Sequence, residues 1–499
     1  MNGPQTRETL ANEIWHACDI LRRDNNCGGI MEYVEHLAWL LFLRFLDAQE
    51  DEWETQAKLA GRTYTRILDG DLRWSNWATK DWPADRLLEF VHGRLIPYLQ
   101  SLGGDPLRDT IRGVFSERNV IVCASGYNLK DVLQILNDID FHSQDDIFTV
   151  SQVYEELLRR LGSENRMAGE FYTPRPVIRF VVEVVNPRIG ETVYDPACGS
   201  CGFLAQAYLH MKKDEKTIED HKTLQERTFF GQEKKALPAL LGLMNMVLHG
   251  VTAPQIRRRN TLEENIRTVT ERFDVVLTNP PFGGKEGRHI QANFPVPSAA
   301  TELLFLQHIM KKLKPRDGAR CGMVVPEGTL FRGGAFATVK QDLLEQFNLH
   351  TIVSLPPGTF APYSDVKTAL IFFERPGPTK EIWYYELPLP EGLKKFSKGN
   401  PIRDEHFDEA RRLWKAWDAY RKGEGPREAC LSERSWIVPV EEIKARGYDL
   451  TARNPNRRET GTLPSPMEIV AGLLEREREI LAIVEELDEL LNNNGEAEA

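Results

Sequence analysis

The stretch from Phe273 to Phe282, FDVVLTNPPF, constrains the fold more than any other part of the chain. Residues 274–278 are mostly apolar or β-branched, which predicts a short buried strand. Two prolines follow Asn279, and because proline has no backbone N–H to donate to a sheet, the strand has to end there. The turn therefore holds an amide side chain and an aromatic ring at the carboxyl end of a strand, the edge where open α/β sheets bind ligands.

The side chains of this turn suit a planar amino group that lies next to an aromatic face. Asn279 offers one hydrogen-bond acceptor and two donors, and the carbonyl of Pro280 has no local competitor because Pro281 lacks an N–H. Phe282 adds a flat ring. Adenine carries both features. An Asn-Pro turn is also an ordinary way to end a strand, so the turn by itself leaves both interpretations open.

The composition is that of a globular protein without a strong charge-driven affinity for nucleic acid. The chain has 499 residues, of which 27% are charged and 41% hydrophobic, and this length predicts two to four domains. The net charge is −11, and residues 468–499 contribute −8 of it. A protein that holds DNA alone usually has a basic surplus. Either nucleic acid is not the substrate, or another component supplies much of the contact.

The sequence favours a cytoplasmic protein without membrane attachment. Residues 1–13 are polar, so we expect no signal peptide, and the most apolar run, Leu37–Leu46, is too short to cross a bilayer. The seven cysteines are scattered and odd in number, which gives no disulfide framework.

Hydrophobic periodicity divides the chain into three regions. Residues 1–150 place apolar side chains at helical spacing and predict a helical domain in which we find no chemistry. Residues 391–499 predict a helical C-terminal region. Residues 151–390 alternate strands with helices, which predicts a doubly wound α/β fold with a parallel sheet. The expected strands are 192–194, 228–231, 274–278, 321–325, 350–355, 368–373 and 381–385.

A last helix is expected at residues 467–491, after a proline-marked break. Its apolar seam consists of Leu473, Ile480, Val484, Leu487 and Leu491. Glu477 interrupts the seam, so the heptad pattern is imperfect. The pattern fits packing on the helix's own domain as well as pairing with a helix of another chain, and the sequence alone does not choose between them.

Residues 193–204 join a predicted strand to a predicted helix through a glycine-containing loop. Small residues let a backbone approach a ligand closely, and the start of a helix presents free N–H groups that suit a carboxylate. Asp195, at the end of the strand, is placed to bind an ammonium group. No lysine follows in the GxxxxGK[ST] pattern, so we expect no nucleotide phosphate here. The next predicted strand leads to Glu233, an acid placed to accept both hydroxyls of a ribose.

Cys198 and Cys201 form a CxxC motif inside this loop. Such a motif occurs in redox pairs and in zinc sites. No second CxxC and no clustered histidines lie near it in the sequence to complete four zinc ligands, so we expect no metal. A tight strand–helix turn needs small residues in any case, and this structural interpretation is favoured.

Four motifs in this order resemble those of the S-adenosylmethionine-dependent N6-adenine DNA methyltransferases, and more narrowly the modification subunit of type I restriction–modification systems. They are Glu170-Phe-Tyr-Thr-Pro174, Asp195-Pro-Ala-Cys-Gly-Ser-Cys-Gly-Phe-Leu204, Gly231-Gln-Glu233 and Asn279-Pro-Pro-Phe282, with supporting stretches at 302–308, 324–331 and 352–360. The resemblance covers nearly the whole chain. The sequence departs from the family at Cys201, where glycine is usual, and at Arg259-Asn260, where Gly-Asp is frequent.

The resemblance implies methyl transfer from S-adenosylmethionine to N6 of an adenine that is flipped out of the DNA duplex. It assigns the catalytic role to Asn279, Pro280, Pro281 and Phe282. It assigns the cofactor site to Glu170, Phe171, Tyr172, Thr173, Pro174, Arg175, Asp195, Gly199, Ser200, Cys201, Gly202, Glu233 and Asn260. In that set, Thr173 and nearby backbone amides would hold the cofactor carboxylate, Asp195 and residues 199–202 the amino-acid end, and Glu233 the ribose.

The resemblance also implies partners: a DNA-specificity subunit, a second copy of this chain, a restriction subunit, and double-stranded DNA with a flipped adenine. After residue 390 only about a hundred residues remain, too few for two base-reading domains and the last helix, which supports a separate specificity subunit. Two alternatives stay open. One is a stand-alone methyltransferase that acts on RNA or protein, and the other is a non-catalytic module that uses the cofactor pocket as a scaffold.

Overall fold

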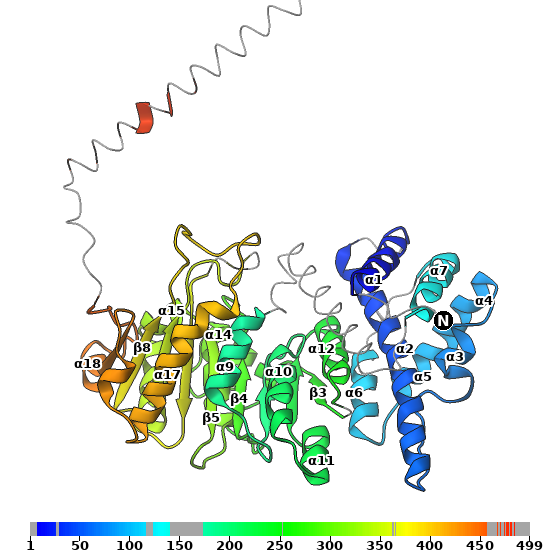
Figure 1. The fold of residues 1–499 in the computed structure, drawn as a ribbon, viewed down its shortest axis with the longest axis horizontal. Helices are drawn as coiled ribbons and strands as arrows, with labels where there is room; N and C mark the ends of the chain where they lie inside the picture. Colours follow the sequence, from blue (N-terminus) through cyan, green and yellow to red (C-terminus); the bar gives the residue numbers. More distant parts are fainter. Residues whose placement is uncertain are drawn as a thin grey trace, which may run out of the picture. The chain divides into compact units, whose positions relative to one another are not determined.

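The computed structural model describes residues 7–25, 29–115, 123–139, 173–251, 253–361, 364, 366–456 and scattered positions between 467 and 484. The chain forms two compact units, residues 1–453 and 454–499. The first unit contains a helical part followed by a nine-stranded sheet with helices on its faces (Figure 1). Within the described ranges, no helix has both the length and the apolar character needed to cross a membrane.

The helical part, blue to cyan in Figure 1, is organised around the 30-residue helix α2 (Ile30–Leu59). Residues Val34, Leu37, Leu41 and Phe45 lie on this helix at the predicted spacing, and all four are buried. The helical fold expected for this part of the sequence is therefore confirmed for the described residues. The other helices are α1 Arg7–Leu21, η1 Gly70–Leu72, α3 Trp74–Trp77, α4 Ala84–Phe90, η2 Val91–Leu95, α5 Ile96–Ser101, α6 Pro106–Phe115 and α7 Gly126–Asn137.

The sheet has the strand order β3-β2-β1-β4-β5-β7-β6-β8-β9. Strands β3, β2, β1, β4 and β5 are parallel, whereas β7 runs antiparallel to both β5 and β6, and β9 runs antiparallel to β8. The α/β class is confirmed, but the expectation of a wholly parallel sheet is wrong. The described residues between β6 and β7 form no helix, and a strand that returns without a crossover helix pairs antiparallel. The strands are β1 Val193–Asp195, β2 Phe229–Glu233, β3 Gln255–Arg258, β4 Val275–Thr278, β5 Arg320–Pro326, β6 Asn348–Ser354, β7 Thr368–Glu374, β8 Glu381–Glu386 and β9 Ser435–Pro439.

Strands β3 and β9 are absent from the sequence prediction. In β3 only Ile256 is buried, so the strand has almost no apolar signal. Strand β9 comes from the region expected to be helical, yet it pairs with β8 over residues 435–439. The division that we expected at residue 390 therefore falls inside the sheet, and the first compact unit continues to Arg453.

Helices cover both faces of the sheet, as a doubly wound fold requires. Helices α9, α10 and α17 share one hydrophobic cluster with strand residues such as Leu277 and Leu370. Helices α14, α16 and α18 share another with residues such as Val276 and Ile371. The helices of this part are α9 Arg175–Val185, α10 Gly202–Met211, η4 Lys212–Asp214, α11 Ile218–Glu226, α12 Ala236–Leu248, η5 Thr261–Glu263, α13 Arg288–Gln291, α14 Thr301–Lys312, α15 Glu327–Phe331, α16 Ala335–Gln346, η6 Asp404–Phe407, α17 Asp408–Arg421, η7 Arg427–Cys430 and α18 Val440–Ala445.

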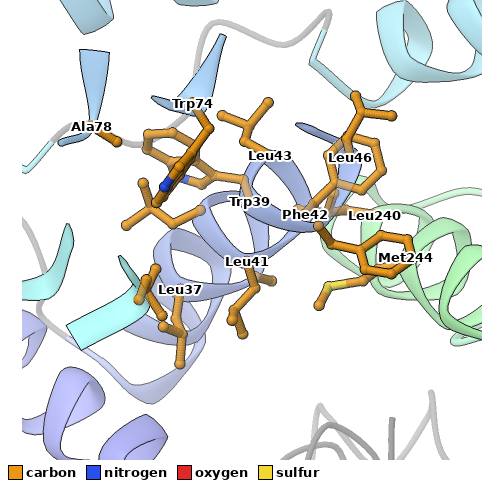
Figure 2. Packing of buried hydrophobic residues seen from close by; sticks show 14 of the residues in the cluster. Leu37, Trp39, Leu41, Phe42, Leu43, Leu46, Trp74, Ala78, Leu240 and Met244 are labelled. Carbon is orange, nitrogen blue, oxygen red and sulfur yellow. The ribbon is translucent and has the colours of Figure 1, made fainter. Parts of the chain in front are cut away.

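Helix α12 joins the helical part to the sheet. Its residues Leu240 and Met244 belong to the same hydrophobic cluster as Phe42 and Leu46 of α2, and Figure 2 shows these side chains together. The same helix contacts α6 of the helical part as well as β2, β3 and α10 of the sheet region. The two parts therefore share one core.

The second unit contains the segment expected to form the last helix, most of which lies outside the described residues. The described positions between 467 and 484 are helical. Of the predicted seam, Ile480 and Val484 are described, and both are exposed, at 61% and 54%. The choice between the two interpretations of this helix stays open.

Candidate active site

Three of the four motifs meet at one edge of the sheet. The strand order reverses between β1 and β4, and such a switch point is where open α/β sheets bind ligands. Asp195 is the last residue of β1, Glu233 is the last residue of β2, and Asn279 directly follows β4. Thr173, from the remaining motif at residues 170–174, lies at the same place, where it contacts Asn279. The predicted cofactor residues Glu170, Phe171 and Tyr172 lie outside the described residues.

The amide of Asn279 is fixed at one end and unpaired at the other. Its Nδ2 donates a hydrogen bond to Thr173 Oγ1 at 2.9 Å. Its Oδ1 is buried and has no hydrogen-bond partner among the described residues. A buried acceptor without a partner costs about 1–3 kcal/mol and calls for an explanation. The oxygen is therefore available to a donor that arrives with a ligand.

The ring of Phe282 is held by a second aromatic residue. Phe282 is partly buried, and its ring meets that of Phe360 edge to face, with centroids 6.1 Å apart and an interplanar angle of 88°. Phe360 is 4% exposed and lies on the loop after β6. This loop turns through Gly358, where φ is +75° and a Cβ would come within 2.1 Å of the carbonyl oxygen of Phe396. Sequence reasoning did not single out Phe360, although it closes one of the supporting stretches.

Asp195 is a buried carboxylate with little compensation. It is 1% exposed, and its Oδ1 accepts a hydrogen bond from the N–H of Ala197 at 3.0 Å. Burial raises the pKa of Asp195 to about 7, and the negative charge of Glu233 adds to the rise. A cation that binds beside Asp195 would lower this pKa again, since an opposite charge favours the ionised form. The carboxylate therefore suits an ammonium group.

Glu233 connects the end of β2 to the glycine loop. Its Oε2 accepts from the N–H of Gly199 at 3.1 Å, and its Oε1 accepts from the N–H of Lys235 at 2.8 Å. Burial raises the pKa of Glu233. The N–H of Lys234 also donates to this carboxylate. A carboxylate has about four acceptor positions, so some acceptor capacity remains for a ligand hydroxyl.

Two adjoining recesses open at this edge of the sheet. Both are lined by Ala197 and Asn279. The first is lined by six of the predicted cofactor residues, namely Thr173, Arg175, Asp195, Gly199, Ser200 and Gly202. The second, of about 200 Å³, is lined by Glu233, Asn260 and Pro281, among others. The donor set fits S-adenosylmethionine, because the carboxylate of Asp195 faces the small recess and that of Glu233 faces the larger one.

Two of the described cofactor candidates do not line either recess. Pro174 precedes α9 as its N-cap residue, and Cys201 is fully buried at the start of α10. Asn260 lines the larger recess but uses its amide locally, because its Oδ1 accepts from Leu262 N at 3.2 Å and its Nδ2 donates to Glu263 Oε1 at 3.3 Å.

The CxxC motif has the character of packed thiols. A hydrogen bond with Cys201 raises the pKa of the Cys198 thiol well above its ordinary value, and burial raises it further. The thiolate, which is the form that attacks disulfides and binds metals, is thereby disfavoured. In the parts of the chain that the structure describes, no group of three or more His, Cys, Asp or Glu side chains is arranged for a metal ion.

Comparison with known families identifies the family of the chain. Residues 143–461 match the model of the N-6 DNA methylase family, and residues 10–136 match that of the HsdM N-terminal domain. The chain belongs to the N-6 DNA methylase family. Its activity is therefore the transfer of a methyl group from S-adenosylmethionine to N6 of adenine in DNA.

Individual relatives extend this match over the whole chain. The type I restriction enzyme EcoEI methylase subunit of Escherichia coli is 40% identical over 493 residues, covering 97% of this N-6 DNA methylase and 98% of the relative. The EcoKI methylase subunit of E. coli strain K12 is 30% identical over 464 residues, covering 87% and 80%. A chain from a structural study of assembly and conformational transition of the type I restriction–modification system is 82% identical, covers 98% and 99%, and superimposes with a TM-score of 0.82.

Proposed function

We propose that residues 279–282 bind the target adenine and that the recesses beside them hold S-adenosylmethionine. The observation that carries this assignment is the buried, unpaired Oδ1 of Asn279, at the carboxyl end of β4 and on the wall between both recesses. An adenine amino group offers two N–H donors. One would bind Asn279 Oδ1, and the other the carbonyl of Pro280.

These two acceptors prepare N6 for the reaction. By holding both hydrogens, Asn279 and Pro280 orient the amino group and concentrate lone-pair density on the nitrogen. S-adenosylmethionine supplies the methyl group as a sulfonium when bound. The new bond joins N6 to the methyl carbon while the bond from that carbon to sulfur breaks, and the surplus proton of N6 leaves to solvent. Positioning does most of the work, because the leaving group is already cationic.

The aromatic pair would offset part of the free energy needed to extrude the base from the duplex. Extruding a base requires a few kcal/mol, and stacking on an aromatic side chain contributes about 1–3 kcal/mol per base. Phe282 would supply the stacking surface. Phe360 would keep that ring in place through the edge-to-face contact.

The cofactor contacts follow from the charges of the two recesses. The buried carboxylate of Asp195 would bind the ammonium group. Glu233 would accept from the ribose hydroxyls with the acceptor capacity that the N–H groups of Gly199, Lys234 and Lys235 leave unused. Thr173 and the amides around residues 199–202 would bind the carboxylate, and Asn260 would line the adenine end.

The chain would act inside a type I complex, on DNA that a separate subunit selects. Its relatives are subunits of type I restriction enzymes. We propose a DNA-specificity subunit, a second copy of this chain and a restriction subunit as partners. The helix expected at 467–491 would bind a partner helix, since the described seam residues Ile480 and Val484 are exposed and the charge of −8 on residues 468–499 disfavours DNA. The cytoplasmic location stays a prediction.

The test is reconstitution with a specificity subunit encoded beside this chain. The full chain and a chain ending at Pro466 are each mixed with that subunit, and complex formation is followed by light scattering. Transfer of labelled methyl groups to duplex DNA, RNA and protein is then measured. We expect DNA methylation only by the complex of the full chain, with cofactor binding intact in the shortened chain. Methylation of RNA or protein by the chain alone, or cofactor binding without any transfer, would favour the alternatives.

A further inference from the structure

Helix α12 forms a wall behind the glycine loop. Asn245, which is 1% exposed, donates from Nδ2 to the carbonyl oxygen of Ser200 at 2.8 Å. One turn earlier, Gly242 leaves room for the loop, because a Cβ there would lie 2.6 Å from Cys201 Sγ and 2.8 Å from the carbonyl oxygen of Gly199. Residues three apart share one face of a helix. This face of α12 therefore determines where residues 199–201 lie.

The thiol of Cys201 fills the space that Gly242 leaves. Cys201 has φ 57° and ψ 30°, the left-handed conformation that glycine adopts without strain, and its side chain is fully buried. The carbon missing at position 242 and the side chain present at position 201 are thus complementary. Volume added at position 242 should be compensated in part by volume removed at position 201, since the contact with the carbonyl oxygen of Gly199 does not depend on that side chain.

Helix α12 cannot yield away from the loop without disturbing a second core. Leu240 and Met244, on another face of α12, pack with Phe42 and Leu46 of the helical part (Figure 2). Well-packed cores resist displacement. A side chain added at position 242 would therefore push the loop. The loop would carry with it the N–H of Gly199, which donates to Glu233.

We propose that Gly242 and Asn245 are positioning residues for the cofactor, which act by holding residues 199–201 and, through Gly199, the carboxylate of Glu233. This inference rests on the proposed role of that loop and of Glu233 in binding S-adenosylmethionine. It also gives Cys201 a function in this chain. Its side chain is the counterpart of Gly242, and neither position can change alone without moving the loop.

The experiment measures the dissociation constant of S-adenosylmethionine by calorimetry on the full-length chain and the melting temperature of each variant. We expect Gly242→Ala to weaken binding about tenfold. The strain of adding one methyl group to a packed core changes an equilibrium constant by about that factor. The double variant Cys201→Gly/Gly242→Ala should recover part of the affinity that Gly242→Ala loses, because it removes the contact with Cys201 Sγ and keeps the one with the carbonyl oxygen of Gly199. Asn245→Leu should weaken binding by a factor comparable to that of Gly242→Ala. In the reconstituted complex, Gly242→Ala should raise KM for the cofactor and leave kcat unchanged.

Two controls make the outcome decisive. Gly113→Ala, on helix α6, adds the same carbon where no described atom outside the neighbouring residues and the backbone of its own helix lies within 4 Å, and it should leave the affinity unchanged. Glu233→Ala tests the proposed site itself. If Glu233→Ala binds normally, the proposed cofactor site is wrong. If Glu233→Ala binds poorly while Gly242→Ala and Asn245→Leu bind normally, or if removing the Cys201 side chain fails to rescue Gly242→Ala, the positioning role is refuted. A loss of melting temperature without a loss of affinity in the folded fraction would refute it as well.

Discussion

The two edges of the sheet each contain a buried carboxylate, and the two carboxylates differ in the partners that surround them. Asp274, just before β4 at the amino edge, and Asp195, at the carboxyl edge, are each 1% exposed. Asp274 accepts from the N–H and Oγ1 of Thr192 at 2.9 and 2.8 Å, and it forms ion pairs with Lys314 at 2.7 Å and with Arg316. Asp195 has no ion pair among the described residues. It accepts from the N–H of Ala197, and the side chain of Thr278 also favours its ionised form.

The difference appears in the acidity of the two groups. Burial alone would raise the pKa of Asp274, but the hydrogen bonds from Lys314 and Thr192 outweigh it and hold the pKa below the ordinary value. The pKa of Asp195 rises to about 7. The chain itself thus supplies Asp274, which serves stability, with hydrogen-bond and ion-pair partners. At the other edge, a carboxylate without an ion pair lies near an amide oxygen without a hydrogen-bond partner among the described residues, and this is the edge where we propose that the ligands bind.

The largest effect should come from removing the unpaired oxygen at the carboxyl edge. Asn279→Ala should lower kcat for DNA methylation by about a thousandfold or more, since removing a positioned hydrogen-bonding group in a catalytic site has this magnitude. Cofactor affinity should fall much less, because the proposed partner of Asn279 Oδ1 is the base and only the contact of Asn279 with Thr173 links it to the cofactor ligands. Single-turnover methylation and calorimetry measure the two quantities. Wild-type methylation by Asn279→Ala would show that this oxygen is not functional.

At the amino edge we expect a loss of stability without a loss of function. Asp274→Asn should lower the free energy of unfolding by about 2–3 kcal/mol, a value reduced for the partial exposure of Lys314 and Arg316. Urea denaturation measures it. The folded variant should bind S-adenosylmethionine with unchanged affinity. A variant that loses cofactor affinity while keeping its stability would reverse the roles that we assign to the two edges.

The contrast predicts opposite responses to pH. Because the pKa of Asp195 in the folded chain, about 7, exceeds its ordinary value of about 3.9, its contribution to stability falls as pH rises between these values. Cofactor binding needs the ionised form, so affinity should fall about tenfold per pH unit below 7. For Asp274, with a lowered pKa, the contribution is present at neutral pH and is lost in acid. Titrations at several pH values check this, and Asp195→Asn should bind weakly with little pH dependence between 5 and 7.

The smallest effect concerns the aromatic contact at the carboxyl edge. Phe360→Leu should raise KM for DNA by roughly three- to tenfold, which corresponds to the 0.5–1.5 kcal/mol of an aromatic pair. Phe347→Leu is a matched control, because Phe347 and Phe373 form a similar edge-to-face pair, with centroids 5.5 Å apart, inside the core. That variant should lose stability and keep its KM. Equal KM values for both variants would show that Phe360 does not contribute to base binding.

The sequence predicted the elements whose signal is local. The seven expected strands and the turn after β4 are found within a few residues of their predicted positions, because apolar runs and proline act within the segment itself. Strand β3 was not predicted because three of its four residues are polar and its place at the edge of the sheet depends on pairing with β2. Strand β9 escaped because it lies after a stretch of helical pattern, and only its pairing with β8 identifies it.

The same distinction applies to the site. Asp195, Glu233 and Asn279 were found because each follows a recognisable strand. Phe360 and Asn245 were not, since nothing near them in the sequence indicates that one supports Phe282 and the other holds Ser200. Contacts between segments that are far apart in the chain leave no periodic pattern in the sequence. They become visible only when the fold brings the segments together.

The position of β7 between β5 and β6 has a consequence for biosynthesis. A ribosome releases β5 and β6 before β7, yet β6 reaches β5 only through β7, the strand that lies between them. Until residue 374 has emerged, β6 therefore has no neighbouring strand through which to join the sheet. The apolar residues of these strands remain without neighbours for that interval, which is when a nascent chain is most prone to aggregate. Slow decoding between β6 and β7 would prolong this interval.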